Sequence, residues 1–402
     1  MTDRARRYRV LLVATHAVQY ASPVFRQMAR DPRLEIQVAY CSLQGAETGV
    51  DPEFGREVKW DVPLLDGYPW TQIPNRSRLP GLGRFFGLFN PGLWSLIRKG
   101  RFDAVVIYTG YRYASFWIAL AAVKFSGAKL LFGTDAAALA VRGGSSLRLR
   151  AKKIAWPWLF RLADQIIVPS TSAQEMIRSL GYSPARVSMT PYVVDNDWWL
   201  ARAAEVDRSS VRASWGVPDS HVVILFCAKL QPWKRPQDLL RAFGQANATS
   251  AHLVFAGDGP LSASLESEAA ELGIRARVHF LGFTNQSQLP AVYCASDLLV
   301  LPSDYEPFGV VVNEAMLCGS AVAVSDRVGA GRDLVSAENG FIFPVGDIEA
   351  LAAILRAAAS DPLRLRALGA ASRKRMETWS IPANVEAFVQ ALDCAFRLAP
   401  AI

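Results

Sequence analysis

The chain has 402 residues, of which 51% are apolar and 20% are charged, and this length and composition predict a globular protein with two domains. Five scattered cysteines form no C-x-x-C pair, which argues against a disulfide framework and a zinc site. Reduced cysteines are typical of the cytoplasm, so we expect a cytoplasmic protein. No apolar run reaches the roughly 18 residues that a membrane span requires.

The net charge of +8 is distributed unevenly along the chain. Residues 1–203 contain 27 lysines and arginines against 15 acidic residues, a net charge of +12, whereas residues 204–402 have a net charge of −4. Halves of opposite charge are expected to meet different partners. The basic half contains no motif that reads a nucleic-acid groove, so we do not expect nucleic acid to be a partner.

The first half of the chain alternates short apolar runs with helical patterns. The runs rich in Val and Ile predict strands at residues 9–15, 35–41, 104–108, 128–135 and 165–170. Helical patterns lie between most of these strands, as at residues 171–181, where Thr and Ser stand at the start and Gly at the end. Such alternation predicts βαβ units and a parallel sheet.

The same alternation starts again in the second half. Further strands are predicted at residues 222–230, 251–259, 278–283, 298–303, 321–326 and 340–345. We therefore predict an α/β protein with two doubly wound, Rossmann-like domains that face a central cleft. The expected domains are residues 1–200 and 201–380, and residues 381–402 are expected to form a helix that crosses back to the first domain.

Two carboxylates stand eight positions apart in "EPFGVVVNEAM", residues 306–316. Glu306 lies in a turn, and Phe308 and Gly309 are predicted to open a helix whose free N–H groups and dipole suit a phosphate. Glu314 would lie roughly two turns further, about 12 Å along the helix, where it could reach a sugar of the same nucleotide. From the spacing alone, an ordinary turn acid and an ordinary helix residue remain the better alternative.

Two lysines lie where a predicted strand passes into a helix, in "AKLQPWKRPQDLLRAF", residues 228–243. Lys229 ends the strand and Lys234 lies in the following loop. Two ammonium groups at such a turn could neutralise a diphosphate leaving group in place of a metal ion. The alternative is a pair of solvated lysines. The glycine-rich "FAGDGP" at residues 255–260 is, by itself, only a turn signal.

Taken in order, these segments resemble the family-4 retaining glycosyltransferases of the GT-B architecture, the glycosyl transferases group 1. The resemblance covers residues 222–350 densely, from "AKLQPWKRPQDLLRAF" to "NGFIFPVGD", and the spacing of Glu306 and Glu314 is that of the family's E-x7-E motif. Six blocks in the same order are far more specific than any one of them. The N-terminal half resembles the family only in its architecture.

The resemblance implies roles for the residues of the E-x7-E motif. Glu306 would be catalytic and would contact the transferred sugar. The backbone amides of Phe308, Gly309 and Val310 would hold the diphosphate, and Glu314 would bind the ribose hydroxyls.

Lys229 and Lys234 would stabilise the leaving diphosphate, and both are therefore also catalytic candidates. Lys229 stands where the family more often has arginine, so its contact would lack the planar fork of a guanidinium. Phe283 falls where the family places the nucleotide base. The resemblance implies a nucleotide-diphosphate sugar as co-substrate, and neither a metal nor another cofactor.

The N-terminal half departs from the family where the acceptor should bind. The loop "THAVQYASP" lacks the usual glycine pair, and a histidine common after a later strand is absent. His16, the sole histidine in this half, follows the first strand and is a candidate to assist the acceptor hydroxyl, with a structural role as the alternative. Asp135 in "FGTDA" is a second acceptor-side candidate. A retaining enzyme need not supply a base, because a donor phosphate oxygen can take the proton.

Two weaker signals remain. The D-x-D at residues 195–197 is the metal motif of another glycosyltransferase architecture, but it lies in the predicted domain link, which favours a structural role. Residues 75–101 and 142–164 interleave lysine and arginine with aromatic residues, a pattern that suits an anionic membrane surface and a lipid-linked acceptor. Amphipathic helices that pack on the sheet are the alternative for these segments.

The sequence therefore predicts a retaining, metal-independent hexosyltransferase that moves a sugar from a nucleotide diphosphate to a glycan, lipid-linked or small-molecule acceptor. Polysaccharide or glycolipid biosynthesis is the expected context, with a peripheral position at the inner face of a membrane. A nucleotide-sugar epimerase is one alternative, but it needs acid–base groups that the histidine-poor N-terminal half lacks. A non-catalytic nucleotide-sugar-binding protein is the other, and an intact Glu306 with both lysines speaks against it.

Overall fold

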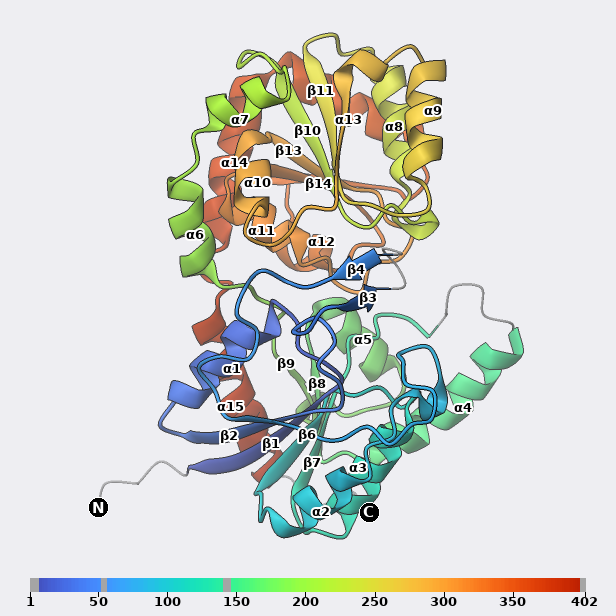
Figure 1. The fold of residues 1–402 in the computed structure, drawn as a ribbon, viewed down its shortest axis with the longest axis vertical. Coiled ribbons are helices and arrows are strands. Elements are labelled where there is room, and N and C mark those ends of the chain that lie inside the picture. Colours follow the sequence, from blue (N-terminus) through green and yellow to red (C-terminus); the bar gives the residue numbers. More distant parts are fainter. Residues whose placement is uncertain (1–6, 52–55, 140–145, 398–402) are drawn as a thin grey trace. The chain divides into compact units, whose positions relative to one another are not determined.

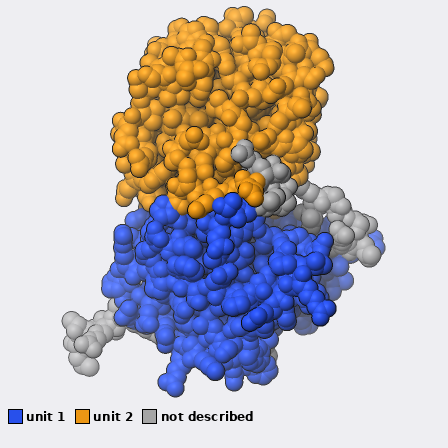
Figure 2. Space-filling view, viewed as in Figure 1, with its two compact units in different colours: residues 1–49, 63–192, 381–402 blue, residues 50–62, 193–380 orange. Residues whose placement is uncertain are grey.

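The computed structural model describes residues 7–51, 56–139 and 146–397, and the chain divides into two compact units (Figure 2). Unit 1 comprises residues 1–49, 63–192 and 381–402, and unit 2 comprises residues 50–62 and 193–380. Each unit is built around a parallel sheet of its own (Figure 1). The prediction of two doubly wound, Rossmann-like domains with a helical C-terminus is confirmed.

The sheet of unit 1 has the strand order β5–β2–β1–β6–β7–β8–β9, and its neighbouring strands run parallel. Its strands are β1 (Tyr8–Ala14), β2 (Leu34–Tyr40), β5 (Trp70–Gln72), β6 (Ala104–Ile107), β7 (Lys129–Gly133), β8 (Gln165–Val168) and β9 (Val187–Met189). The chain order reverses between the neighbouring strands β1 and β6. Ligands of doubly wound sheets bind outside the carboxyl ends of the strands at such a reversal.

Helices cover both faces of this sheet (Figure 1). The helices are α1 (Ala21–Arg30), α2 (Gly92–Lys99), α3 (Ala114–Lys124), α4 (Ser146–Arg161), α5 (Thr171–Ser179) and α15 (Ile381–Arg397). Apolar side chains of α2 to α5 share one core with the strands, whereas α1 and α15 pack against each other and against other parts of the sheet. The hydroxyl of Tyr8 in β1 donates to Asp393 of α15 at 2.5 Å. Of the predicted basic–aromatic segment 142–164, residues 142–145 lie outside the described residues.

The sheet of unit 2 has the strand order β12–β11–β10–β13–β14–β15 and is also parallel. Its strands are β10 (Val222–Cys227), β11 (Ala251–Ala256), β12 (Val278–Gly282), β13 (Leu298–Leu301), β14 (Ala321–Ser325) and β15 (Gly340–Phe343). Here the chain order reverses between β10 and β13. Both strands are fully buried, as expected for a parallel sheet covered on both faces.

Unit 2 also carries helices on both faces of its sheet (Figure 1). They are α6 (Asn196–Ala204), α7 (Arg208–Ser214), α8 (Pro236–Ala246), α9 (Ser262–Glu271), α10 (Leu289–Ala295), α11 (Val311–Leu317), α12 (Gly329–Leu334), α13 (Ile348–Ser360) and α14 (Pro362–Arg375). Helices α8, α9, α13 and α14 share a core with the strands, and α6, α7, α10 and α11 form a second group. Within the described part of the chain, no helix is long and apolar enough to cross a membrane.

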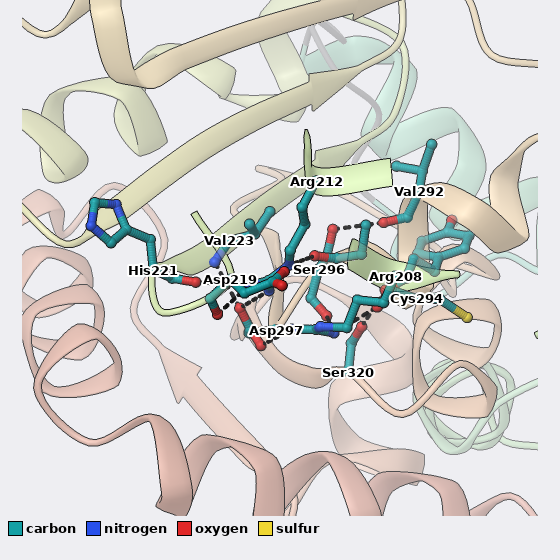
Figure 3. Close-up of polar contacts among 12 residues, drawn as sticks. Arg208, Arg212, Asp219, His221, Val223, Val292, Cys294, Ser296, Asp297 and Ser320 are labelled. Carbon is teal, nitrogen blue, oxygen red and sulfur yellow. Dashed lines mark hydrogen bonds and ion pairs between the residues drawn. The ribbon is translucent and has the colours of Figure 1, made fainter. Parts of the chain in front are cut away.

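A buried ion-pair cluster fixes α7 to the sheet of unit 2 (Figure 3). Asp297, just before β13, pairs with Arg208 and Arg212 of α7 and accepts the backbone N–H of Val223 in β10 at 2.7 Å. Arg212 is only 1% exposed and also donates to the carbonyls of Ala295 at the end of α10 and of Asp219 and His221 in the loop before β10. These contacts lie at the amino ends of β10 and β13, the end opposite to the candidate site.

Every predicted strand overlaps an observed one. The strands that the sequence did not predict are β5, β9 and a separate two-stranded ribbon of β3 (Gly49–Asp51) and β4 (Arg56–Val58). Each has only three residues, which is too short for a recognisable apolar pattern.

Candidate active site

The topology of unit 2 brings the predicted donor residues to one edge of the sheet. Lys229 follows β10, Lys234 ends the short 3₁₀ helix Pro232–Lys234, and Glu306 follows β13. Because β10 and β13 are neighbours at the point where the strand order reverses, the loops after them meet at the position where doubly wound sheets bind ligands.

Lys234 and Glu306 form an ion pair between Nζ and Oε2. Their side chains are only 18% and 15% exposed, so the pair is poorly screened by solvent. The N–H of Asp304 donates to the carbonyl of Trp233 at 2.8 Å, which ties the two loops together. The sequence assigned these side chains to a phosphate and to a sugar, and in the structure they neutralise each other.

The backbone holds Glu306 from both sides. It forms an isolated parallel bridge with Val328, in which its N–H donates to Arg327 at 3.2 Å and its carbonyl accepts from Gly329 at 2.9 Å. A Cβ atom on Gly329 would lie 2.1 Å from the carbonyl oxygen of Pro307, so only glycine fits there. The position of the acid is thus fixed by the main chain.

Helix α11 begins at Val311, later than the start predicted at Phe308 and Gly309. Gly309 has a φ of +97°, and a Cβ there would lie 3.1 Å from Leu301 and 3.2 Å from Glu306. This left-handed glycine cannot belong to the helix, because a right-handed helix requires negative φ. Glu314 consequently lies in the first helical turn and not two turns along.

The other residues of this turn have structural contacts as well. Phe308 is buried, and its ring stacks on Trp379 with a centroid separation of 6.2 Å and an interplanar angle of 6°. Val310 is the N-cap residue of α11. The side chain of Phe308 therefore anchors the turn on which the predicted phosphate-binding amides lie.

Glu314 is buried within a small polar network. The hydroxyl of Tyr293 donates to its Oε2 at 2.8 Å, and Nε2 of Gln286 donates to its Oε1 at 3.5 Å. The Tyr293 hydroxyl also lies 3.2 Å from Sγ of Cys227. Burial raises the pKa of Glu314 to about 7, although both hydrogen bonds lower it. Near neutral pH this carboxyl group can therefore change its charge, and it accepts hydrogen bonds best when ionised.

Sequence reasoning missed Tyr293 and Gln286. Tyr293 lies in α10 and Gln286 in the loop before it, and their side chains reach Glu314 only because α10 packs beside α11. The sole available signal was that Tyr293 lies within a block, "YCASD", that resembles the family.

Lys229 and Phe283 lie on loops of the same edge, after β10 and β12, with the loop after β11 between them. The Lys229 loop is fixed by the glycine-rich segment, since the N–H of Leu230 donates to the carbonyl of Asp258 at 3.0 Å. Phe283 follows β12 and is half-buried, with its ring centroid 6.0 Å from that of Trp60. Trp60 belongs to the segment 50–62 of unit 2, and sequence reasoning did not identify it.

In unit 1, the acceptor-side candidates lie at the carboxyl edge of the sheet. His16 follows β1 by two residues and Asp135 follows β7 by two residues, with β6 between these strands. Strands β1 and β7 are two strand spacings apart, which is about 10 Å. The pKa of Tyr192 is raised mainly by burial, and the charge of Asp135 contributes to this shift.

The D-x-D segment has a structural role. Asp195 caps α6 by accepting the N–H of Trp198 at 3.1 Å, and Asn196 donates to the carbonyls of Met376 and Trp379. Among the described residues, no cluster of three or more histidine, cysteine or acidic side chains could hold a metal ion.

Two family models match the chain, and together they cover most of both halves. The model of the glycosyl transferases group 1 matches residues 207–375, which include every predicted donor residue. The model of glycosyltransferase family 4 matches residues 36–198.

Individual proteins are similar to the chain along most of its length. A D-inositol 3-phosphate glycosyltransferase of Rhodococcus erythropolis is 27% identical over 94% of this chain and 89% of its own. The Anabaena protein Alr3699/HepE, crystallised with UDP, has a TM-score of 0.73 at 19% identity over 96% of this chain and 99% of its own. A Rickettsia africae glycosyltransferase has a TM-score of 0.75 at 15% identity over 98% of this chain and 100% of its own. The chain belongs to the family-4 glycosyltransferases of the GT-B architecture.

Proposed function

We propose that this glycosyltransferase is a retaining, metal-independent hexosyltransferase that uses a uridine diphosphate sugar as donor. The observation that carries the proposal is the partly buried pair of Lys234 and Glu306 at the strand reversal of unit 2. Lys234, which could stabilise a leaving diphosphate, thus lies beside Glu306, which could contact the sugar. The choice of uridine is supported by the Anabaena neighbour, which was crystallised with UDP and with UDP-glucose.

In this proposal unit 2 holds the donor. Lys229 and Lys234 contact the diphosphate together with the backbone amides of residues 308–310, and Lys234 leaves its partner Glu306 when the donor arrives. Glu306 then contacts the hexose. Glu314 accepts hydrogen bonds from the ribose, and Phe283 contacts the base.

The chemical step exchanges one glycosidic bond for another on the same face of the sugar. The bond between the anomeric carbon and the phosphate oxygen breaks, and its electron pair stays on the diphosphate. The acceptor oxygen bonds to the anomeric carbon, and its proton passes to the departing phosphate oxygen. The lysine ammonium groups stabilise the charge that develops on the diphosphate, which is the task that a divalent metal performs in other enzymes.

Unit 1 is proposed to bind the acceptor, with His16 and Asp135 near its hydroxyl groups. The Rhodococcus relative is named for a phosphorylated cyclitol acceptor. The net charge of +12 on residues 1–203 suits an anionic acceptor, whether this is a small phosphorylated molecule, a glycan or a lipid-linked sugar.

A surface of unit 1 supports a peripheral position at an anionic membrane. Trp94 of α2 lies against Phe125, which is 67% exposed, and Arg98 donates to the carbonyl of Phe125. Lys124 donates to the carbonyl of the exposed Leu162 at 2.5 Å, which joins the ends of α3 and α4. We call these five residues the basic–aromatic patch. Exposed aromatic rings beside cations suit the headgroup region of an anionic bilayer.

The experiment that tests the reaction is transfer from UDP-glucose in the presence of EDTA, with the anomeric configuration of the product read by NMR. We expect transfer without metal and a product with the configuration of the donor. An inverted product, or activity lost with EDTA and restored by a divalent ion, would contradict the proposal. A new sugar nucleotide formed without acceptor would indicate an epimerase, and UDP binding without donor consumption would indicate a binding protein.

A further inference from the structure

A segment from the N-terminal part of the chain is bound to the predicted base-binding loop of unit 2. The Asp61 carboxylate accepts both the N–H of Ser287, at 3.0 Å, and its hydroxyl. The N–H of Asp61 reaches Oδ1 of Asn285 at 3.4 Å, and Nδ2 of Asn285 donates to the carbonyl of Lys59 at 2.9 Å. Residues 59–61 therefore hold the loop 283–287 by four hydrogen bonds, and we call them the 59–61 clamp.

The clamp also places an aromatic ring beside Phe283. The ring centroids of Trp60 and Phe283 are 6.0 Å apart and their planes are inclined by 46°, so the two rings form an angled corner rather than a stack. Both side chains are half-buried. A planar ring could pack against a face of this corner. The hydrogen bonds of the clamp fix the position of Trp60 relative to Phe283.

The clamped loop is connected to the acid that is proposed to bind ribose. Gln286, in the middle of the loop, is only 8% exposed and donates to Glu314 at 3.5 Å. One loop therefore carries a ring at the proposed base position and an amide at the proposed ribose position. Any shift of the loop would move both groups together.

We propose that Trp60 is a specificity-determining wall of the nucleotide-base position and that Asp61 is a positioning residue that holds the loop 283–287 in place. This inference rests on the proposed use of a nucleotide donor. It extends the donor site to residues 59–61, which lie far outside the region matched by the group 1 family model. Stacking on an aromatic side chain strengthens the binding of a base by about tenfold or more.

The test is calorimetric titration of the full chain with UDP and with ADP. For Trp60→Ala we expect UDP to bind about tenfold more weakly and the preference for UDP over ADP to shrink. Trp60→Phe should keep most of the affinity. For Asp61→Asn we expect a smaller loss, because the amide is a weaker acceptor for the Ser287 groups. The control is Trp70→Ala, which removes an exposed tryptophan of unit 1 and should leave both affinities unchanged.

The outcomes separate this inference from the proposed function. A wild-type protein that binds neither nucleotide contradicts the use of a nucleotide donor. A wild-type protein that binds UDP, with unchanged binding in Trp60→Ala, contradicts only the role of Trp60. Tighter binding in that variant would overturn the inference too, because Trp60 would then occupy the base position. Melting temperatures show which variants fold. If Trp60→Ala does not fold, the ratio of UDP to ADP affinity is measured on Trp60→Phe instead.

Discussion

At the scale of single residues, the pairing of Lys234 with Glu306 links the two charges that the proposed reaction uses separately. In the structure, the positive charge of Lys234 and the negative charge of Glu306 neutralise each other, and both side chains are largely buried. An unpaired charge in such a place is costly, so removing either side chain leaves the other without its partner.

Substitutions of Glu306 and of Lys234 are predicted to affect transfer and UDP affinity differently. Glu306→Gln should reduce transfer by about a hundredfold or more without weakening UDP binding, because the proposed contact of the acid is with the sugar. Lys234→Ala should reduce both transfer and UDP affinity, because the ammonium group is proposed to contact the diphosphate. Initial rates and calorimetry on both variants check this. Undiminished turnover in either variant would contradict the role assigned to that residue.

The raised pKa of Glu314 predicts a stability that depends on pH. The folded pKa of about 7 lies above the ordinary value of 4.5, so the stabilising contribution is present below pH 4.5 and is lost as the pH rises through 7. Glu314→Gln should therefore melt at a higher temperature than the wild type at about pH 8, with a smaller advantage at about pH 5. UDP binding should weaken in the same variant.

Thermal denaturation at several pH values measures this effect, with the exposed Glu266→Gln as the matched control. A melting-temperature difference for Glu314→Gln that stays constant across the pH range would contradict the raised pKa.

The sequence predicted some residues of the candidate site and missed others for a physical reason. Glu306, Glu314 and Lys234 belong to local segments that resemble the family in order and spacing, and their roles follow from that resemblance. Tyr293 and Trp60 contact predicted site residues that are distant from them in sequence, and a single sequence contains no record of such contacts.

At the scale of elements, most of the two sheets could be predicted because their strands are buried on both faces and read as apolar runs. The exact start of α11 could not, since it depends on the left-handed conformation of Gly309. That glycine is also where the main chain passes close to Glu306. The three-residue strands carry too few side chains to show a period.

The attachment of α7 provides a prediction for stability. Asp297→Ala would leave Arg212 buried without its carboxylate partner, and removing one member of a buried ion pair typically costs about 3–5 kcal/mol. Denaturant unfolding measures the loss, and the exposed Asp66→Ala should change the free energy of unfolding by no more than about 0.5 kcal/mol. A loss equal to that of the control would show that the cluster adds nothing to stability.

At the scale of the whole molecule, the charge is divided unevenly between the two halves of the chain. The mildly acidic half contains the donor residues that the family resemblance implies, and the basic half contains the acceptor-side candidates, the basic–aromatic patch and the proposed base-position residue Trp60. The sequence revealed this division through composition alone, whereas it could not show which aromatic side chains are exposed.

The basic–aromatic patch predicts binding to anionic vesicles. The wild type should co-sediment with vesicles that contain phosphatidylglycerol, and the bound fraction should fall as salt screens the cations. Phe125→Glu should reduce the bound fraction, because it removes an exposed ring and adds a repelled charge. Leu272→Glu, on an exposed position of unit 2, is the control and should bind as the wild type does. Equal sedimentation with neutral and anionic vesicles would contradict an electrostatic membrane surface.

The measurement that tests the central claim most directly is calorimetric titration of the purified protein with UDP, GDP, ADP and dTDP, each in the presence of EDTA. We predict clear binding of UDP without a metal ion and weaker binding of the other three. The absence of measurable binding for all four diphosphates at millimolar concentration would contradict the claim that the site around Glu306 and Lys234 holds a nucleotide-diphosphate donor.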